Sequence, residues 1–292
     1  MITALSITWA PDPEIFSIGP IHIRYYSVLF ISGFIIGFGL FMKFFRRENL
    51  PVNILDSLLY TLLISATLGA RLGHCFFYEP AYYLANPIEI FKIWEGGLAS
   101  HGGTIGILIA IIFWVKKYGR RYNFNYIWLL DRLAIATPLA AMLIRLGNLM
   151  NSEIYGNATD MPWGFIFTLR GETLAKHPAQ LYEALCYLML FVIQMVIWKK
   201  WLPKMKEGIF IGIFFIGTFA SRFFIEFIKE PQVPFEEGMT LNMGQWLSIP
   251  FVLLGIGLII YGYITKKPAM LQPESPKKKK ETALTDNIRT KE

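Results

Sequence analysis

Residues 243–264 read MGQWLSIPFVLLGIGLIIYGYI, a run of 22 residues without a charged side chain. A helix needs about 20 apolar residues to cross a bilayer core about 30 Å thick. Six further stretches meet this length with some tolerance, and they cover residues 24–45, 54–78, 98–117, 126–147, 178–200 and 208–229. We therefore predict an all-α integral membrane protein with about seven transmembrane helices.

The composition of the 292-residue chain agrees with this prediction. Hydrophobic residues make up 54% and charged residues 17%, and a soluble domain has about 25% charged residues. Cys75 and Cys186 lie inside apolar runs, which excludes a disulfide framework or a thiolate metal site. The net charge of +7 does not indicate nucleic-acid binding, because the basic residues lie between hydrophobic blocks instead of on one water-facing surface.

The distribution of basic residues predicts the orientation. Nineteen of the 28 Lys and Arg residues lie in the first, third and fifth connections and in the C-terminal tail. Basic residues close to a span resist translocation, so we expect the N-terminus outside and the C-terminus in the cytoplasm. No basic residue precedes Arg24, which argues against a cleaved signal peptide. We expect one polytopic membrane domain over residues 1–265 and a disordered basic cytoplasmic tail over 266–292.

Five arginines lie within or at the edges of the predicted spans, where a charge is costly unless it is paired or hydrated. Arg132 follows Asp131, and we expect it to snorkel or to pair locally. The predicted orientation places the other four in the outer leaflet: Arg24, Arg71, Arg145 and Arg222. An interior lined by arginines at one membrane face is suited to binding an anion.

Further polar clusters stand at the same predicted face. They are HGGTIG at 101–106, RLGNLMNSEIYG at 145–156, HPAQLYE at 177–183, RFFIEF at 222–227 and NMGQ at 242–245. Singly, each has a structural explanation: an interfacial histidine, amides that cap a helix end, or an intramembrane ion pair between Arg222 and Glu226. Their gathering at one face favours a shared anion site, and the planar fork of arginine suits the phosphate of a lipid headgroup.

These five runs, with IFSIGPIHIRYYS at 15–27, resemble the motifs of the bacterial prolipoprotein diacylglyceryl transferases, and the likeness covers residues 15–264. The 145–156 run is the most specific of them. The resemblance implies transfer of the diacylglyceryl group of phosphatidylglycerol to the lipobox cysteine of a preprolipoprotein at the outer face of the bacterial cytoplasmic membrane. Leu149 departs from the family, which often has Phe there, and the segment between Gly156 and His177 is short.

The resemblance also implies roles for individual residues. His101 is the candidate base, and Arg145 and Arg222 are the candidate phosphate ligands, so these three are the expected catalytic residues. The other expected phosphatidylglycerol-binding residues are Tyr26, Arg71, Asn148, Glu153, Gly156 and Glu226. A possible further site consists of His177, Gln180, Tyr182 and Glu183. We expect no metal and no organic cofactor.

Two other classes of protein fit parts of the pattern. A transporter for an anion needs a polar path to the cytoplasm, yet the inner halves of the spans contain almost no ionisable groups. Another phospholipid-headgroup transferase or hydrolase fits the arginines equally well. Metal-dependent members of that class need an acidic ligand cluster, which the sequence lacks.

Overall fold

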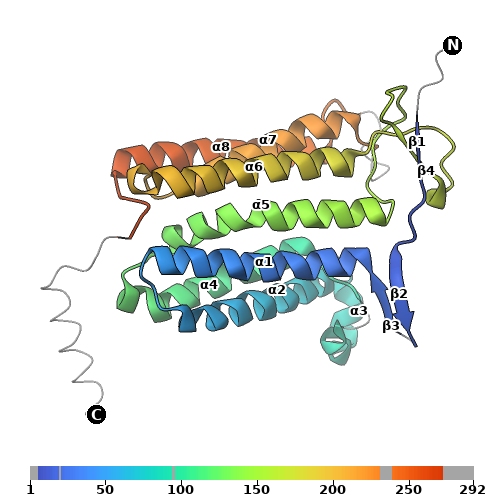
Figure 1. Cartoon of the computed structure of the whole chain (residues 1–292). Coiled ribbons are helices and arrows are strands. Elements are labelled where there is room, and N and C mark those ends of the chain that lie inside the picture. The colour runs from blue at the N-terminus through green and yellow to red at the C-terminus, as the bar shows by residue number, and fades with distance from the viewer. Residues whose placement is uncertain (1–5, 20, 94–95, 231–238, 272–292) are drawn as a thin grey trace, which may run out of the picture. The chain divides into compact units, whose positions relative to one another are not determined.

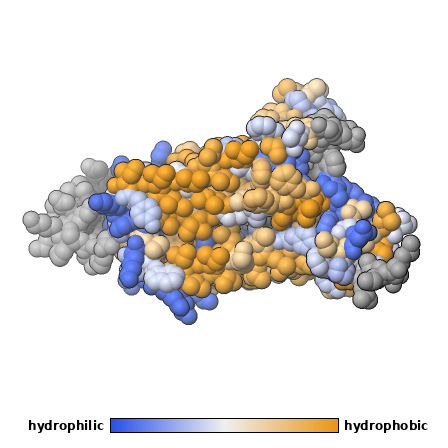
Figure 2. Space-filling model, turned by 90° about the horizontal axis from the view of Figure 1, so that it is seen from above, coloured by the Kyte–Doolittle hydropathy of each residue, from blue (hydrophilic) through white to orange (hydrophobic). Residues whose placement is uncertain are grey.

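The computed structural model describes residues 6–19, 21–93, 96–230 and 239–271 (Figure 1). Seven helices within these ranges are long and apolar enough to cross a membrane, which confirms the predicted spans. They are α1 (Tyr25–Arg47), α2 (Leu55–Phe77), α4 (Ser100–Tyr122), α5 (Tyr126–Met150), α6 (Ala179–Trp201), α7 (Ile209–Ile225) and α8 (Met243–Thr265). Apolar residues cover the helix flanks, and hydrophilic residues gather toward the helix ends (Figure 2).

Short elements connect these helices. Helix α3 (Pro80–Ala85) and a 3-10 turn (Pro87–Phe91) follow α2. Strand β1 (Ile7–Trp9) pairs in parallel with β4 (Phe165–Phe167), and β2 (Glu14–Ile18) pairs with β3 (Ile21–Arg24) in an antiparallel hairpin. Further 3-10 turns cover Val52–Ile54, Thr168–Arg170, Leu202–Lys204 and Glu226–Ile228. None of these elements was predicted, because three to six residues are too few for a periodic pattern.

The chain divides into two compact units. The first unit contains residues 1–41 and 130–270, and the second contains 42–129 and 271–292. In the first unit, α7 packs against both α6 and α8. Helix α1 approaches α5 at Gly33, where an added Cβ would lie 3.3 Å from the Cβ of Ala140.

In the second unit, α2 packs along α4 through a contact between glycine backbones. A Cβ on Gly102 would lie 2.2 Å from the carbonyl oxygen of Gly69 and 2.7 Å from the Cα of Gly73, so no side chain fits there. Small residues allow such close approach, which is a common way for helices to associate in lipid.

The start of α7 is held by buried polar groups of α5. Both carboxylate oxygens of Asp131 accept hydrogen bonds, one from the backbone N–H of Gly208 and one from that of Ile211. Arg132 is fully buried and donates to the carbonyl of Ala269. Arg132 therefore does not snorkel, because the chain beyond α8 supplies an acceptor for it. It also interacts electrostatically with the adjacent Asp131, which agrees with the alternative of local pairing.

Backbone contacts of the residues that follow α8 correct the predicted start of the tail. The N–H of Ala269 donates to the carbonyl of Met205, and the N–H of Glu207 donates to the carbonyl of Lys267. Ala269 is fully buried, so the packed chain continues beyond residue 265. The remainder of the predicted tail, 272–292, lies outside the described residues.

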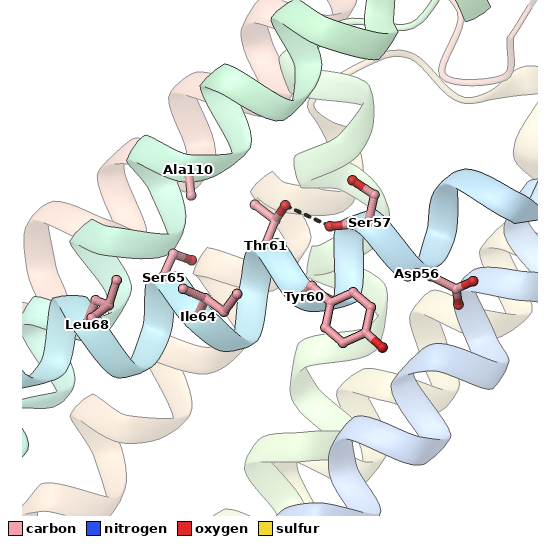
Figure 3. A pocket seen from close by; sticks show the side chains of 8 residues that line it. All are labelled: Asp56, Ser57, Tyr60, Thr61, Ile64, Ser65, Leu68 and Ala110. Carbon is pink, nitrogen blue, oxygen red and sulfur yellow. Dashed lines mark hydrogen bonds between the residues drawn. The ribbon is translucent and has the colours of Figure 1, made fainter.

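A hollow of about 650 Å³ lies on the flank of α2 and is bordered by Ala110 of α4 (Figure 3). The hydroxyl of Thr61 donates to the carbonyl of Ser57, and that of Ser65 donates to the carbonyl of Leu62, so both are satisfied within α2. No arginine, lysine or histidine is among the residues that line the hollow. Its chemistry does not match the predicted anion site.

Candidate active site

The first cluster of charges joins the C-terminal end of α5 to the start of α6. The Nε of Arg145 lies 2.5 Å from the Oε2 of Glu183, whose side chain is fully buried. The Arg145 side chain is 20% exposed. An unpaired charge is costly in the membrane, and this ion pair gives each of the two side chains a partner of opposite charge.

Lys229 extends this pair toward α7. Its Nζ donates to the Oε1 of Glu183 at 2.8 Å and to the Oε1 of Glu226 at 3.1 Å. Glu226 also pairs with Arg222, whose Nε lies 3.4 Å away. The result is a line of alternating charges that we call the ion-pair chain, in the order Arg145, Glu183, Lys229, Glu226 and Arg222. It begins and ends on an arginine.

The two terminal arginines differ from the buried members of the chain. The Arg222 side chain is 39% exposed, whereas Lys229 is 3% exposed and Glu183 is fully buried. A guanidinium carries five N–H donors. Within the described part of the protein, the Nε of Arg222 has no hydrogen-bond partner of good geometry. This Nε is buried beside Glu226, so it is the exposed fractions of the Arg145 and Arg222 side chains, 20% and 39%, that leave the ends of the ion-pair chain accessible to an anion.

Lys229 and Tyr187 were missed in the sequence analysis. Lys229 was not among the expected site residues, although its position three residues after Glu226 would have predicted a pair on one helical face. Tyr187 is buried on α6 and interacts electrostatically with Glu183, Arg145 and Arg222. Nothing in the local sequence distinguishes Tyr187 from an ordinary aromatic residue in a span.

The turn after α5 is organised around the carboxylate of Glu153. Asn148 accepts a hydrogen bond from the Nη1 of Arg145 at 3.2 Å and donates to the Oε1 of Glu153 at 2.8 Å. Asn151 donates to the same oxygen at 3.2 Å. The Nε2 of Gln180 donates to the backbone carbonyl of Glu153 at 2.6 Å. Thus Arg145, Asn148 and Glu153 form one hydrogen-bonded series, and Gln180 of α6 binds the backbone at its last member.

Tyr26 and Gly156 lie at the edges of this arrangement. A Cβ on Gly147 would lie 2.7 Å from the ring of Tyr26, and the Tyr26 hydroxyl interacts electrostatically with Glu153 and Arg145. A Cβ on Gly156 would lie 2.3 Å from the carbonyl oxygen of Ile228. Gly156 therefore allows the chain after α5 to approach the chain after α7, which bears Lys229.

His177 and Tyr182 form a separate hydrogen-bonded group. The Nδ1 of His177 lies 3.1 Å from the Tyr182 hydroxyl, which accepts a hydrogen bond from the indole N–H of Trp163 at 2.8 Å. Burial lowers the pKa of His177 below its usual value of about 6.5. The lowered pKa favours the neutral form of His177, and its Nδ1 and the Tyr182 hydroxyl share one hydrogen bond.

In the second unit, Arg71 binds protein backbone. It is 3% exposed, and it donates through Nε to Ile90 O at 3.0 Å, through Nη1 to Gly96 O at 2.5 Å and through Nη2 to Glu89 O at 2.6 Å. Its guanidinium also lies 5.1 Å from the centre of the Tyr83 ring. These backbone carbonyls take up much of the donor capacity of the Arg71 guanidinium. The expected contact of Arg71 with phosphatidylglycerol stays a prediction.

His101 stands in the first turn of α4 in the same unit, and its side chain is exposed. The next residue is Gly102, which fixes α4 against α2. The expectation that His101 acts with Arg145 and Arg222 stays a prediction.

The comparison with known proteins decides the family. The family described as prolipoprotein diacylglyceryl transferase matches residues 13–261. The chain belongs to this family. Curated relatives named phosphatidylglycerol–prolipoprotein diacylglyceryl transferase include those of Tolumonas auensis, 48% identical over 252 residues, and Chloroherpeton thalassium, 44% identical over 275 residues. These alignments cover 86% and 94% of this chain, and 96% and 100% of the relatives. The relative from Porphyromonas gingivalis is 48% identical over 269 residues, which is 87% of this chain and 94% of that protein.

The match to the diacylglyceryl transferase family covers most of both units and the whole ion-pair chain, from Arg145 to Lys229. Across the described ranges, no three His, Cys, Asp or Glu side chains are grouped so that they could hold a metal ion.

Proposed function

We propose that this protein transfers the diacylglyceryl group of phosphatidylglycerol to the thiol of the lipobox cysteine in a preprolipoprotein. Membership of the diacylglyceryl transferase family and the names of its relatives support the reaction. The observation that carries the proposal for the site is the ion-pair chain. It presents Arg145 and Arg222 at its two ends and satisfies the charges between them.

The chemistry is a displacement at carbon. The thiolate sulfur attacks the glycerol carbon that bears the phosphate ester, a C–S bond forms, the C–O bond breaks, and glycerol phosphate leaves. Negative charge therefore moves from sulfur to the phosphate in the transition state. Fixed cationic donors aimed at the leaving group stabilise that charge without the reorganisation that water requires.

Arg145 and Arg222 are assigned to the phosphate of phosphatidylglycerol. Asn148 and Glu153 orient Arg145, and Glu226 orients Arg222. Tyr26 lies where it can contact the headgroup beside Arg145. Gly156 permits the close packing of the segments that surround the site. Glu183 and Lys229 keep the two arginines in one electrostatic unit, and Gln180 supports the turn that carries Glu153.

The reaction also requires removal of the proton from the substrate thiol. A free thiol with a pKa of about 8.5 is mostly protonated at pH 7, so a positioned base increases the thiolate fraction. His101 is assigned this role because it is an exposed histidine at the end of a span.

Arg71 is assigned to holding the segment after α3. His177 and Tyr182 are assigned to the packing of the segment between α5 and α6.

We further propose that the protein resides in the bacterial cytoplasmic membrane with its N-terminus outside and its C-terminus in the cytoplasm. The concentration of basic residues in alternate connections supports this orientation. The ends of α5 and α7 and the start of α6 then face the extracytoplasmic side. That is the side on which a translocating precursor presents its lipobox.

The transfer reaction is tested with purified protein, phosphatidylglycerol of defined acyl chains and a synthetic lipobox peptide. Mass spectrometry should show a peptide that is heavier by one diacylglyceryl group, together with free glycerol phosphate. A peptide with Ser in place of the lipobox Cys is the control and should remain unmodified. Release of diacylglycerol without modification of the peptide would instead identify a headgroup hydrolase.

The orientation is tested by cysteine labelling in intact cells, in a Cys75→Ala, Cys186→Ala background. A cysteine introduced at Asn157 should react with a membrane-impermeant thiol reagent. One introduced at Tyr122 should react only after the cells are made permeable. The reverse pattern would place the ion-pair chain on the cytoplasmic side and contradict the proposed orientation.

A further inference from the structure

The turn after α5 has an unusual backbone. Ser152 has φ +52° and Ile154 has φ +62°, so two residues that are not glycine adopt left-handed conformations within three positions. Such conformations are uncommon for residues with a Cβ, especially for a β-branched one, and they persist only where the surroundings impose them. Glu153 lies between these two residues. Its position therefore depends on whatever holds the turn.

Arg170 holds one side of this turn. It ends the 3-10 turn that follows β4, and it donates through Nε to the carbonyl of Ser152 and through Nη2 to the carbonyl of Asn151, both at 3.1 Å. The planar guanidinium suits two neighbouring acceptors, because its donors are fixed in one fork. A cation is also favourable beside the carbonyls at the C-terminal end of a helix such as α5.

The segment that carries Arg170 is docked against the end of α5 by its own contacts. Leu149 packs with Phe165 and Phe167 of β4 in a buried cluster. The ring of Tyr155 stacks on Phe167 with ring centres 4.8 Å apart. The indole N–H of Trp9 in β1, the partner strand of β4, donates to the carbonyl of Leu149 at 2.9 Å. These contacts place Arg170 over the turn.

A series of hydrogen bonds connects Arg170 through the turn to the site. Arg170 binds the backbone carbonyls of Asn151 and Ser152, and Glu153 is the next residue in the chain. Glu153 accepts from Asn148, and Asn148 accepts from Arg145. We propose that Arg170 is a positioning residue that fixes the left-handed turn, and through Glu153 and Asn148 fixes the guanidinium of Arg145. This inference rests on the proposed function.

Gln180 alone does not replace this contact. From α6 it binds the carbonyl of Glu153, whereas Arg170 binds the carbonyls of the two preceding residues. Without Arg170, the carbonyls of Asn151 and Ser152 lose their donor, and the strained residues can relax toward ordinary dihedral angles. Glu153 would then shift while its own carbonyl stays held. A shift of about 1 Å at a catalytic group is enough to cost about 100-fold in rate.

The test compares Arg170→Met with Arg170→Lys, and uses Thr173→Ala as a matched control in the same segment. Thr173 is exposed and lies three residues from Arg170. The kcat and the KM for phosphatidylglycerol and for the lipobox peptide are measured separately. For Arg170→Met we expect kcat to fall about 10- to 100-fold, with each KM within about threefold of wild type. Arg170→Lys should give an intermediate kcat, because a single ammonium cannot reproduce the fork.

Three kinetic results would overturn the proposal. One is an unchanged kcat in a folded Arg170→Met variant. Another is an increase in the KM for the peptide with an unchanged kcat, which would make Arg170 a substrate contact. The third is an equal loss of kcat in Thr173→Ala, which would show that any change in this segment has the same effect.

Hydrogen exchange separates this inference from the proposed function. Amide exchange of residues 150–156 is measured in wild type, Arg170→Met and Thr173→Ala, without any substrate. Exchange should become faster in Arg170→Met alone if Arg170 holds the turn. An absence of transfer activity in wild type would contradict the proposed function, while the exchange measurement would still decide whether the turn depends on Arg170. Equal exchange in all three proteins would overturn the inference.

Discussion

Arg145 and Arg71 look alike in the sequence, and the structure gives them different partners. Each lies in an apolar helix toward the same predicted face of the membrane. Arg145 contacts the carboxylate of Glu183 and the amide of Asn148, and its side chain remains 20% exposed. Arg71 is 3% exposed and donates to three backbone carbonyls.

This difference teaches which arginine can bind a substrate. A carboxylate partner keeps a guanidinium charged and oriented, and a partly exposed fork still has N–H groups for a second anion. The fork of Arg71 already binds the backbone carbonyls of Glu89, Ile90 and Gly96, and a ligand would have to compete with these hydrogen bonds. A charged residue in a membrane span therefore indicates that polar partners surround it. The kind of partner, carboxylate or backbone carbonyl, indicates whether the residue is suited to binding a ligand.

The largest expected effect is the loss of turnover on replacing His101, the candidate base, which belongs to the second unit. His101→Gln should lower turnover about 100- to 10,000-fold at neutral pH, which is the usual contribution of a general base. The loss should become smaller at alkaline pH, where the substrate thiol ionises without help. Initial rates measured across this pH range test both statements. A loss of the same size at every pH would mean that His101 orients the headgroup and does not take the proton.

The next effect tests the arginine at the end of the ion-pair chain. Arg145→Ala should reduce transition-state stabilisation by about 2.7–4 kcal/mol, or about 100- to 1,000-fold in kcat, by analogy with the removal of an oxyanion donor. Arg145→Lys should also lose most activity, because it keeps the charge and loses the fork. Steady-state kinetics with phosphatidylglycerol measure the loss. Near-normal turnover in a well-expressed Arg145→Ala variant would remove Arg145 from the mechanism.

A smaller change in rate is expected at Arg71, together with a larger change in stability. Arg71→Met removes the donor of three carbonyls, and each one that stays dry costs about 1–3 kcal/mol of folding free energy. Thermal unfolding should therefore shift to lower temperature, while the kcat of the folded protein should fall less than about tenfold. A loss of kcat equal to that of Arg145→Ala, without a shift in the unfolding temperature, would restore the role of Arg71 in binding phosphatidylglycerol.

The smallest effect concerns His177, the half-buried histidine of the first unit. The pKa of His177 is lowered by burial, so the unfolded chain takes up this proton at a higher pH than the folded chain does. The stability that depends on neutral His177 is present above a pH of about 6.5 and is lost as the pH falls through the lowered pKa. The unfolding temperature should decline over this range, and His177→Asn should have a smaller decline. Identical slopes would show that His177 does not contribute.

The spans were predictable because their signal is local. The predicted stretch 243–264 corresponds to α8 over Met243–Thr265, and 178–200 corresponds to α6 over Ala179–Trp201. An apolar run of sufficient length determines a helix without reference to the rest of the chain. The ends were less certain where a helix contains charged residues, as in α4, which continues through Arg120 and Arg121 to Tyr122.

The partners of the polar residues were not predictable, because they come from distant parts of the chain. The sequence pattern grouped Arg222 with Glu226, four residues apart, and the structure has this pair. It could not connect Lys229 with Glu183, which is 46 residues away, or assign Glu89, Ile90 and Gly96 to Arg71. Capping amides and ion pairs, which were open alternatives to a ligand site, are both present in the ion-pair chain and its surroundings.

The backbone contact between Gly102 and Gly69 also determines how the second unit responds to bilayer thickness. A helix of 23 residues such as α2 or α4 is about 35 Å long, which exceeds a hydrocarbon core of about 30 Å. Sliding α4 along α2 would bring a side chain to a place where a Cβ lies 2.2 Å from a carbonyl oxygen. The pair must therefore accommodate a thinner or thicker membrane by tilting together. Because His101 immediately precedes Gly102, its height relative to α2 stays the same in membranes of different lipid composition.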